Sequence, residues 1–134
     1  MRRTALPFIG LLLALIAYSA GAATRDSTVY VEIAALLDQL LASGCAFKRN
    51  GTWYTAREAE EHLLRKREYL DSRRPLLSAE QFIELAASKS MVTGRPYMVR
   101  CGNAAPVPSA VWLSLQLQTL RTSRPDQCPV GGWR

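Results

Sequence analysis

The chain has 134 residues, of which 17 are Lys or Arg and 11 are Asp or Glu, for a formal net charge of +6. Hydrophobic residues make up 49% of the sequence, which excludes a chain that is disordered throughout. This length fits one domain and is too short for two independent cores. No motif identifies a biochemical activity.

The first 22 residues are typical of a cleaved signal peptide. Arg2 and Arg3 form a positive start, an apolar run follows over residues 5–20, and small residues at positions 20–22 suit signal peptidase. An uncleaved membrane anchor is the alternative, but the run is short for a membrane span. We therefore expect a periplasmic protein with no stable membrane span after processing.

Removal of residues 1–22 takes away two Arg and no acid, which leaves a charge of 15 minus 11, or +4. The remaining cations do not form a run of about five or more like charges, so we expect no nucleic-acid partner. The expected partner is an unidentified protein or another component of the cell envelope. No cofactor and no metal are expected.

A helix is predicted from a cap at Asp26 or Ser27 to about Ser43, because apolar residues recur there at helical spacing. Gly44 follows where a helix C-cap is expected.

Two alternating segments, 45–49 and 52–55, flank an Asn-Gly pair and predict a β-hairpin. Asn-Gly favours a type I′ turn, because both central residues of that turn need a positive φ. This turn pairs Phe47 with Tyr54, and we expect the face that carries them to be buried.

The rest of the chain predicts three more helices and one more strand. Two segments have the pattern of a capping box, an alternating segment predicts a strand, and a serine is placed to cap the last helix. In that helix, we expect the core to be faced by Val111, Trp112, Leu115 and Leu120. In chain order the elements are a helix over 56–70 after Thr55, a helix over 79–88 after Ser78, a strand over 97–101, a helix over 110–120 after Ser109, and a loose tail over 121–134.

This order of elements, α-β-β-α-α-β-α, indicates an α+β fold. The natural arrangement is a small three-stranded antiparallel sheet, made of the hairpin and the later strand, packed against about four helices. The later strand must pair with the hairpin, because two isolated strands are only marginally stable. We expect the compact domain to span residues 23–120.

Three cysteines, Cys45, Cys101 and Cys128, allow one disulfide and one remaining thiol. Export to an oxidising compartment favours the disulfide. Cys45 opens the first strand and Cys101 closes the third, so their sulfurs can meet if those strands are neighbours. We favour a structural bridge over a redox pair, because the spacing is not C-x-x-C. Cys128 is a spare thiol, an intermolecular link or a competing partner.

Two stretches of the sequence carry a family resemblance. One runs from Gly44 to Gly51 and continues through Tyr54, Ala56, Glu58-Ala59 and His62-Leu63; the other holds Ser78 to Ile83, Ala87 to Ser90, Thr93 to Tyr97, Val99 and Cys101. Together they resemble the YfeK-like family of small exported bacterial proteins, a family of unknown function. The resemblance covers roughly residues 28–120. It implies Gram-negative export and one compact domain, and it supplies no activity or catalytic residue. Met91, where a serine is expected, and Cys128 depart from the pattern.

His62 is the only histidine, and Glu58, Lys66 and Tyr69 lie with it along one flank of the predicted helix. This flank could bind an anion or carry out acid–base chemistry, with His62 as the proton carrier and Lys66 as the charge. Glu58 and His62 also have the spacing of two metal ligands on a helix, but no third ligand is spaced nearby. The simpler interpretation is a histidine that covers the edge of the core.

Lys48 and Trp53 pair across the hairpin on the face turned away from the helices. With Arg49 and Arg100 they could form a basic, aromatic patch for a polymer or a partner protein. The simpler interpretation is a lysine that covers an exposed ring.

The connection that holds Ser88, Ser90, Thr93 and Gly94 could present backbone N–H groups to an anion. It matches no phosphate-binding loop and no nucleophile elbow, and the simpler interpretation is an ordinary loop.

These patterns favour a non-catalytic exported binding or interaction module, with no catalytic residue assigned. The alternatives are a small acid–base hydrolase that uses His62 and a structural envelope protein.

Overall fold

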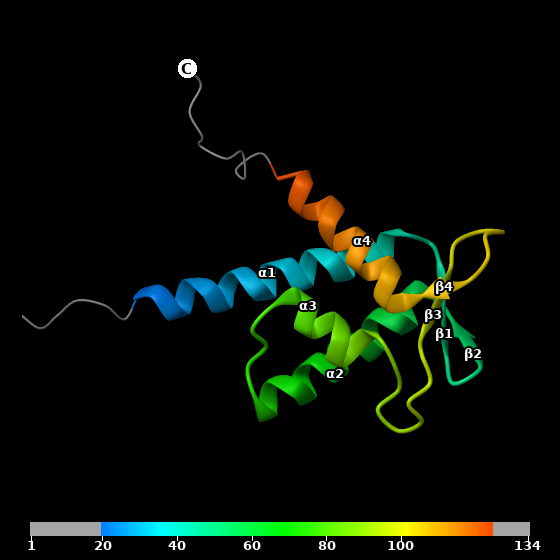
Figure 1. Ribbon diagram of the computed structural model, residues 1–134, viewed down its shortest axis with the longest axis horizontal. Helices are drawn as coiled ribbons and strands as arrows, with labels where there is room; N and C mark the ends of the chain where they lie inside the picture. The colour runs from blue at the N-terminus through cyan, green and yellow to red at the C-terminus, as the bar shows by residue number, and fades with distance from the viewer. Residues whose placement is uncertain (1–19, 125–134) are drawn as a thin grey trace, which may run out of the picture.

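A long first helix leads to a small antiparallel sheet at one end of the molecule (Figure 1). The computed structural model describes residues 20–124, with side chains from residue 28 onward. Within this range no helix is both long enough and apolar enough to cross a membrane. In chain order the elements are α1 (Ala20–Ala42), β1 (Ala46–Arg49), β2 (Thr52–Tyr54), α2 (Ala56–Arg73), α3 (Ala79–Phe82), the π-helix η1 (Ile83–Ala87), β3 (Met98–Arg100), β4 (Val107–Pro108) and α4 (Ser109–Thr122).

The first helix is longer than the sequence predicts. It begins at Ala20, so neither Asp26 nor Ser27 caps it. The segment before them is rich in alanine, the residue with the highest helix propensity, and the helix continues through it. Gly44 has φ +64°, which confirms the expected left-handed residue just after the helix.

The hairpin forms as predicted. Asn50 and Gly51 have φ values of 49° and 86°, as a type I′ turn requires. This turn sets the predicted register, in which Phe47 lies opposite Tyr54. Phe47 is buried and Tyr54 is half-buried on the face that meets the helices.

The sheet has four strands, whereas the sequence predicts three. The strand order is β2-β1-β3-β4, and each neighbouring pair is antiparallel. The fourth strand was missed because Pro106 and Pro108 are typical of a loop. Pro108 has no N–H to donate, so a strand that contains it is tolerated at the edge, where it pairs with β3 alone.

The capping box that opens α2 is confirmed in full. The Thr55 backbone N donates to Glu58 Oε2 at 2.8 Å, and the Glu58 backbone N donates to Thr55 Oγ1 at 3.3 Å. The capping box predicted at Ser78 is only half formed. Ser78 Oγ accepts from the Gln81 backbone N at 3.0 Å, but Gln81 Oε1 accepts from the backbone N of Leu77 at 2.8 Å.

The helix predicted over 79–88 is a short α-helix followed by one π-helical turn, η1. Ser88 Oγ donates to the Ile83 carbonyl at 2.7 Å, and Ser109 Oγ donates to the Ala87 carbonyl at 2.7 Å. The prediction that Ser109 caps α4 is wrong, because Ser109 is the first residue of that helix. Its hydroxyl instead donates to a carbonyl at the end of η1.

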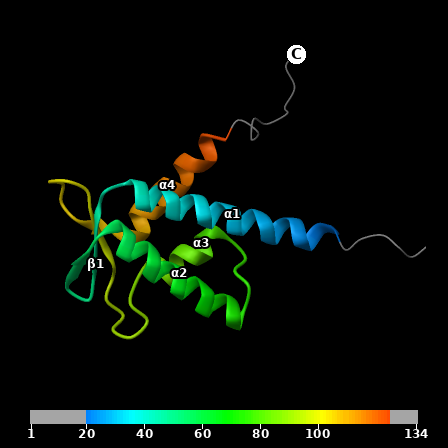
Figure 2. The same cartoon turned by 180° about the vertical axis from the view of Figure 1, so that it is seen from behind.

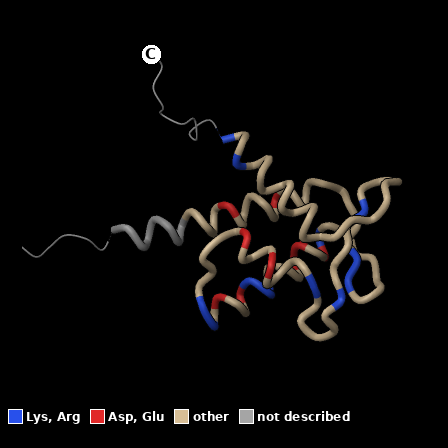
Figure 3. Tube along the Cα trace, in the orientation of Figure 1, with Lys and Arg blue, Asp and Glu red and all other residues tan. Residues whose placement is uncertain are grey.

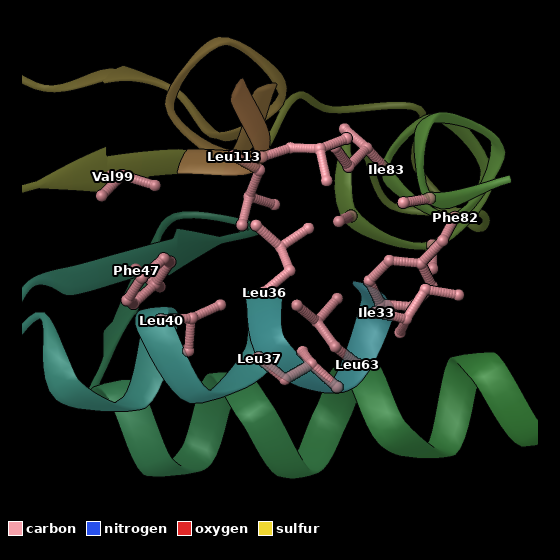
Figure 4. Close-up of a cluster of buried hydrophobic side chains, with 14 of the residues drawn as sticks. Ile33, Leu36, Leu37, Leu40, Phe47, Leu63, Phe82, Ile83, Val99 and Leu113 are labelled. Atoms are coloured by element: carbon pink, nitrogen blue, oxygen red, sulfur yellow. The ribbon is translucent and has the colours of Figure 1, made fainter. Parts of the chain in front are cut away.

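The core lies between the helices and the inner face of the sheet (Figure 4). Helix α4 crosses α1 on one side, and α2 and α3 lie on the other (Figure 2). The buried positions of α4 differ from the prediction, because Val111 and Leu115 are exposed and Leu113 and Leu117 are buried. Val111 and Leu115 are four residues apart, and so are Leu113 and Leu117. Helical spacing alone therefore does not decide which of these two pairs faces the core.

Arg121 ties three helices together. Its Nε and Nη2 donate to the two carboxylate oxygens of Glu32 in α1 at 2.8 and 3.0 Å. Its guanidinium also pairs with Glu80 in α3. Arg121 lies in the last turn of α4 and not in the predicted tail. The other predictions for the termini, on residues 1–19 and 125–134 with Cys128, fall outside the described residues.

The predicted disulfide between Cys45 and Cys101 is present. Ala46 pairs with Arg100 across β1 and β3, so the cysteines that flank this pair lie opposite each other, with Cα atoms 4.3 Å apart. The bridge spans a sequence separation of 56 residues and joins the first strand to a strand formed much later in the chain.

Replacement of Cys45 and Cys101 by alanine should lower the free energy of unfolding by about 4 kcal/mol, because the bridge restricts the unfolded chain. Urea denaturation under oxidising conditions measures the change. Cys128→Ser is the control and should leave stability and the non-reduced peptide map unchanged. A non-reduced peptide map of the wild type that joins Cys128 to Cys45 or Cys101 would contradict the pairing.

Arg121→Met should lower the free energy of unfolding by about 1–3 kcal/mol, because it leaves the buried Glu32 carboxylate without its main partner. Urea denaturation at pH 7 measures this loss. Arg57→Met, at an exposed position of α2, is the matched control and should change stability little. Equal effects of the two variants would show that the Arg121 ion pairs add no stability.

Candidate anion-binding pocket

A pocket of about 240 Å³ lies between the inner face of the hairpin and helix α2. Apolar side chains form part of its wall, and cations, tyrosines and His62 form much of the rest. The lining residues are Phe47, Lys48, Arg49, Tyr54, Glu58, Ala59, Glu61, His62, Leu63, Arg65, Tyr97 and Ser109.

Arg49 enters this pocket from the end of β1. Its Nη1 lies 2.7 Å from Nδ1 and 3.2 Å from Nε2 of His62, and its Nη2 donates to the Tyr54 hydroxyl at 3.4 Å. A guanidinium only donates, so the nearer ring nitrogen, Nδ1, must be the acceptor. The neutral His62 ring therefore carries its proton on Nε2.

Tyr97 lies between His62 and Lys66. Its hydroxyl is 3.2 Å from His62 Nε2 and 3.4 Å from Lys66 Nζ. Since Nε2 carries the proton and an ammonium only donates, the Tyr97 oxygen accepts from both. Lys66 Nζ also donates to the Lys89 carbonyl at 3.1 Å, and the lysine is only 5% exposed.

The pocket therefore has more hydrogen-bond donors than acceptors. The hydroxyl oxygens of Tyr54 and Tyr97 accept from cationic or N–H donors, and no hydrogen bond between described residues gives either hydroxyl proton an acceptor. The ion pairs of the described residues include neither Arg49 nor Lys66. A ligand that accepts hydrogen bonds and carries negative charge would complement this arrangement.

Two acids also line the pocket, Glu58 and Glu61. The Glu58 carboxylate accepts from Thr55 N and Thr55 Oγ1 at 2.8 and 2.9 Å, and these bonds lower its pKa. It is therefore committed to the helix cap.

Burial and nearby cations favour the neutral forms of both basic groups beside Tyr97. Burial, with the charges of Arg49, Lys66 and Arg65, lowers the pKa of His62 from 6.5 to about 4. Burial, with the charge of Arg49, lowers the pKa of Lys66 from 10.5 to about 8. At pH 7 His62 is neutral and Lys66 is mostly charged. A base with such a low pKa is a weak proton acceptor at neutral pH.

Three of the four residues predicted on the helix flank lie at this network. His62 and Glu58 line the pocket, and Lys66 donates to the hydroxyl of Tyr97, which lines it. Tyr69 points elsewhere, with its exposed ring 5.3 Å from the Arg73 guanidinium.

Sequence reasoning missed three partners, Arg49, Tyr54 and Tyr97. The hairpin register already places Arg49 on the same face as Phe47, so this residue could have been found. The prediction that Arg49 belongs to the outer patch is wrong, because its side chain lines the pocket and bonds to His62. Tyr97 lies 35 residues from His62, and only tertiary pairing of the strands reveals it.

The other members of the predicted outer patch do come together. Lys48 Nζ lies 5.5 Å from the centre of the Trp53 ring, and Arg100 Cζ lies 4.3 Å from it. The indole is half-buried beside these cations.

The loop after η1 uses its polar groups internally. Ser90 Oγ accepts from the backbone N of Val92 at 3.3 Å and of Thr93 at 3.2 Å, which leaves these N–H groups unavailable to an anion. No group of three or more His, Cys, Asp and Glu residues within the described part of the chain could hold a metal ion.

The α+β fold with a donor-rich pocket defines a small domain with a candidate ligand-binding site. The chain belongs to a family of unknown function, DUF5329, which matches residues 27–121. No curated protein and no solved structure matches it.

His62 should titrate with a pKa of about 4, because burial disfavours the charged ring and a proton on Nδ1 would also face the Arg49 guanidinium. Its signals in an NMR pH titration are unambiguous, since the chain has one histidine. Arg49→Met should raise this pKa toward 6.5, and Arg57→Met should leave it unchanged. A wild-type value near 6.5 would contradict the arrangement.

The same shift makes stability depend on pH. With a lowered pKa in the folded state, the unfolded chain binds more protons between pH 6.5 and 4, so stability should fall as the pH falls through this range. Thermal unfolding of the wild type and His62→Gln measures the effect. The variant should show the smaller decrease between pH 6.5 and 5, and equal slopes would contradict the prediction.

Proposed function

We propose that the chain is an exported, non-catalytic binding module whose pocket takes a small anion. The observation that carries the proposal is the excess of donors at Arg49, Tyr54, Tyr97 and Lys66. The proposal makes this excess the means of recognising a ligand oxygen.

A bound anion would give hydrogen-bond acceptors to the two tyrosine hydroxyls and negative charge to the two cations. A carboxylate or phosphate oxygen in the pocket would accept from the hydroxyl protons of Tyr54 and Tyr97. Its charge would also offset that of Arg49 and of the buried Lys66, which loses hydration on burial. Hydrogen bonds between charged groups are stronger than neutral ones. Phe47 and Leu63 offer an apolar surface for the body of the ligand.

Several features support export. The N-terminal segment has the charge and apolar pattern of a signal peptide, and the YfeK-like resemblance implies an exported protein. The Cys45–Cys101 bridge is compatible with an oxidising compartment such as the periplasm. Cleavage after Ala22 would retain every residue of the core and the pocket.

Binding suits the site better than hydrolysis. The Nδ1 lone pair of His62 accepts from Arg49, and the low pKa makes the ring a weak base. The Ser109 hydroxyl, which lies at the pocket wall, donates to the Ala87 carbonyl and is not paired with His62.

Benzoate and inorganic phosphate are suitable probes, added separately while the NMR signals of His62 are followed at pH 7. At least one of them should bind saturably and raise the pKa of His62. Arg49→Met and Tyr97→Phe should each weaken binding by about tenfold, through loss of a charge or of one donor. Affinity should also fall as Lys66 loses its charge above pH 8.

Arg57→Met is the matched control and should bind the probe like the wild type. Absence of saturable binding of both probes, or wild-type affinity in Arg49→Met, would contradict the proposal.

A further inference from the structure

The sheet end of the molecule is cationic. No acid occurs between Asp38 and Glu58 or between Glu84 and Asp126, and these two segments contain all four strands, the β1–β2 turn, the loop from η1 to β3 and the β3–β4 loop. In Figure 3 the acids lie on the helices, whereas the strands and the loops beside them carry only Lys and Arg. The strands and the loops beside them thus carry only positive charge, whereas the helices carry both signs, and Glu58 and Glu61 of α2 lie at the pocket beside the hairpin.

Two large apolar side chains project from the same end. Met91 is 57% exposed and Val92 is 93% exposed, and they are adjacent in the loop between η1 and β3. Lys89 and Arg95, both exposed, flank them in the same loop. We call these four residues the loop tip. Isolated exposed apolar residues are common, but this pair is adjacent and has a cation on each side along the loop, which makes it a candidate contact surface.

The loop that presents this tip is held in place. The Ser90 backbone N donates to the Arg95 carbonyl at 3.0 Å, and the Gly94 backbone N donates to the Ser90 carbonyl at 2.9 Å. Thr93 Oγ1 donates to Asn50 Oδ1 at 2.6 Å, which joins the loop to the hairpin turn. These bonds hold the loop in a conformation that exposes Met91 and Val92. The loop therefore needs no rearrangement when it binds a surface.

We propose that the loop tip docks this protein on an anionic phospholipid surface, with Met91 and Val92 inserted among the headgroups and Lys89 and Arg95 facing the lipid phosphates. This contact is separate from the pocket and does not depend on the proposed anion ligand. It is peripheral, and it needs no helix that crosses the bilayer.

Charge and size favour this occupant. Each Lys or Arg near an anionic membrane strengthens binding by about fivefold, and each buried apolar side chain adds to that through loss of contact with water. A protein partner needs a contact patch of about 800 Å² on each side, far more than two side chains at a loop tip offer. A soluble polyanion would use the cations but would leave Met91 and Val92 exposed.

Co-sedimentation with vesicles tests the proposal. The full chain, its N-terminus established by mass spectrometry, is mixed with phosphatidylcholine vesicles with or without phosphatidylglycerol. The wild type should bind only the vesicles with phosphatidylglycerol. Met91→Ser/Val92→Ser should weaken this binding by about tenfold or more, and Lys89→Gln/Arg95→Gln by about 25-fold. Any apolar N-terminal residues that are retained contribute equally to wild type and variants.

The chain offers matched controls for both changes. Leu77→Ser alters an apolar residue that is 73% exposed in the loop between α2 and α3, and Arg73→Gln/Arg74→Gln removes two exposed cations at the C-terminal end of α2. Both should bind like the wild type, as should Arg49→Met, which disrupts only the pocket. The two loop-tip variants and the Leu77→Ser and Arg73→Gln/Arg74→Gln controls should keep the wild-type melting temperature, since the altered side chains are exposed.

Three results would overturn the proposal. One is wild-type binding that does not require phosphatidylglycerol. Another is equal loss in Leu77→Ser and the Met91→Ser/Val92→Ser variant. The third is binding of heparin and vesicles that depends on Lys89 and Arg95 alone, which would indicate a soluble polyanion as the partner.

Discussion

The pairing of β1 with β3 is the contact on which the rest of the structure depends. It joins a hairpin strand to one formed about fifty residues later, and the Cys45–Cys101 bridge closes its end. Through this pairing Tyr97, just before β3, reaches the inner face of the hairpin and meets His62. Without it the hairpin would be an isolated ribbon of marginal stability, and the pocket would lose one wall.

Lys66 links the core to the proposed functions. Burial of an ammonium group is unfavourable, and here the Lys89 carbonyl and the Tyr97 hydroxyl are its hydrogen-bond acceptors, neither of them charged. An anion in the pocket would supply the missing charge. Lys89 lies at the start of the loop that presents Met91 and Val92. The bond from Lys66 to the Lys89 carbonyl therefore also anchors the base of the proposed membrane contact. The pocket and the loop tip are thus neighbouring surfaces on one end of the fold.

Polar groups inside the structure serve both packing and recognition. Arg121 has carboxylate partners on two helices and acts as a structural clamp. Among the described residues Arg49 has hydrogen bonds only to His62 and Tyr54, which carry no negative charge, so its charge remains available to a ligand. The difference between these arginines lies in the charge of their partners and not in their depth, since both are half-buried.

The sequence by itself determined the features that depend on neighbouring residues. Asn50-Gly51 set the turn and the hairpin register, Thr55 and Glu58 set the start of α2, and strand alternation placed Cys45 to meet Cys101. It also indicated His62 and Lys66, because their helical spacing puts them on one flank.

Only the tertiary structure decided the features that depend on distant contacts. Pro108 forms a strand because β3 is beside it, and Leu113 is buried in place of Val111 because of where α4 crosses α1. Tyr97 completes the donor network for the same reason, since strand pairing brings together residues that no local pattern relates. Local sequence fixes turns, caps and faces, whereas the choice between equally apolar faces and the assembly of a pocket require the packed chain.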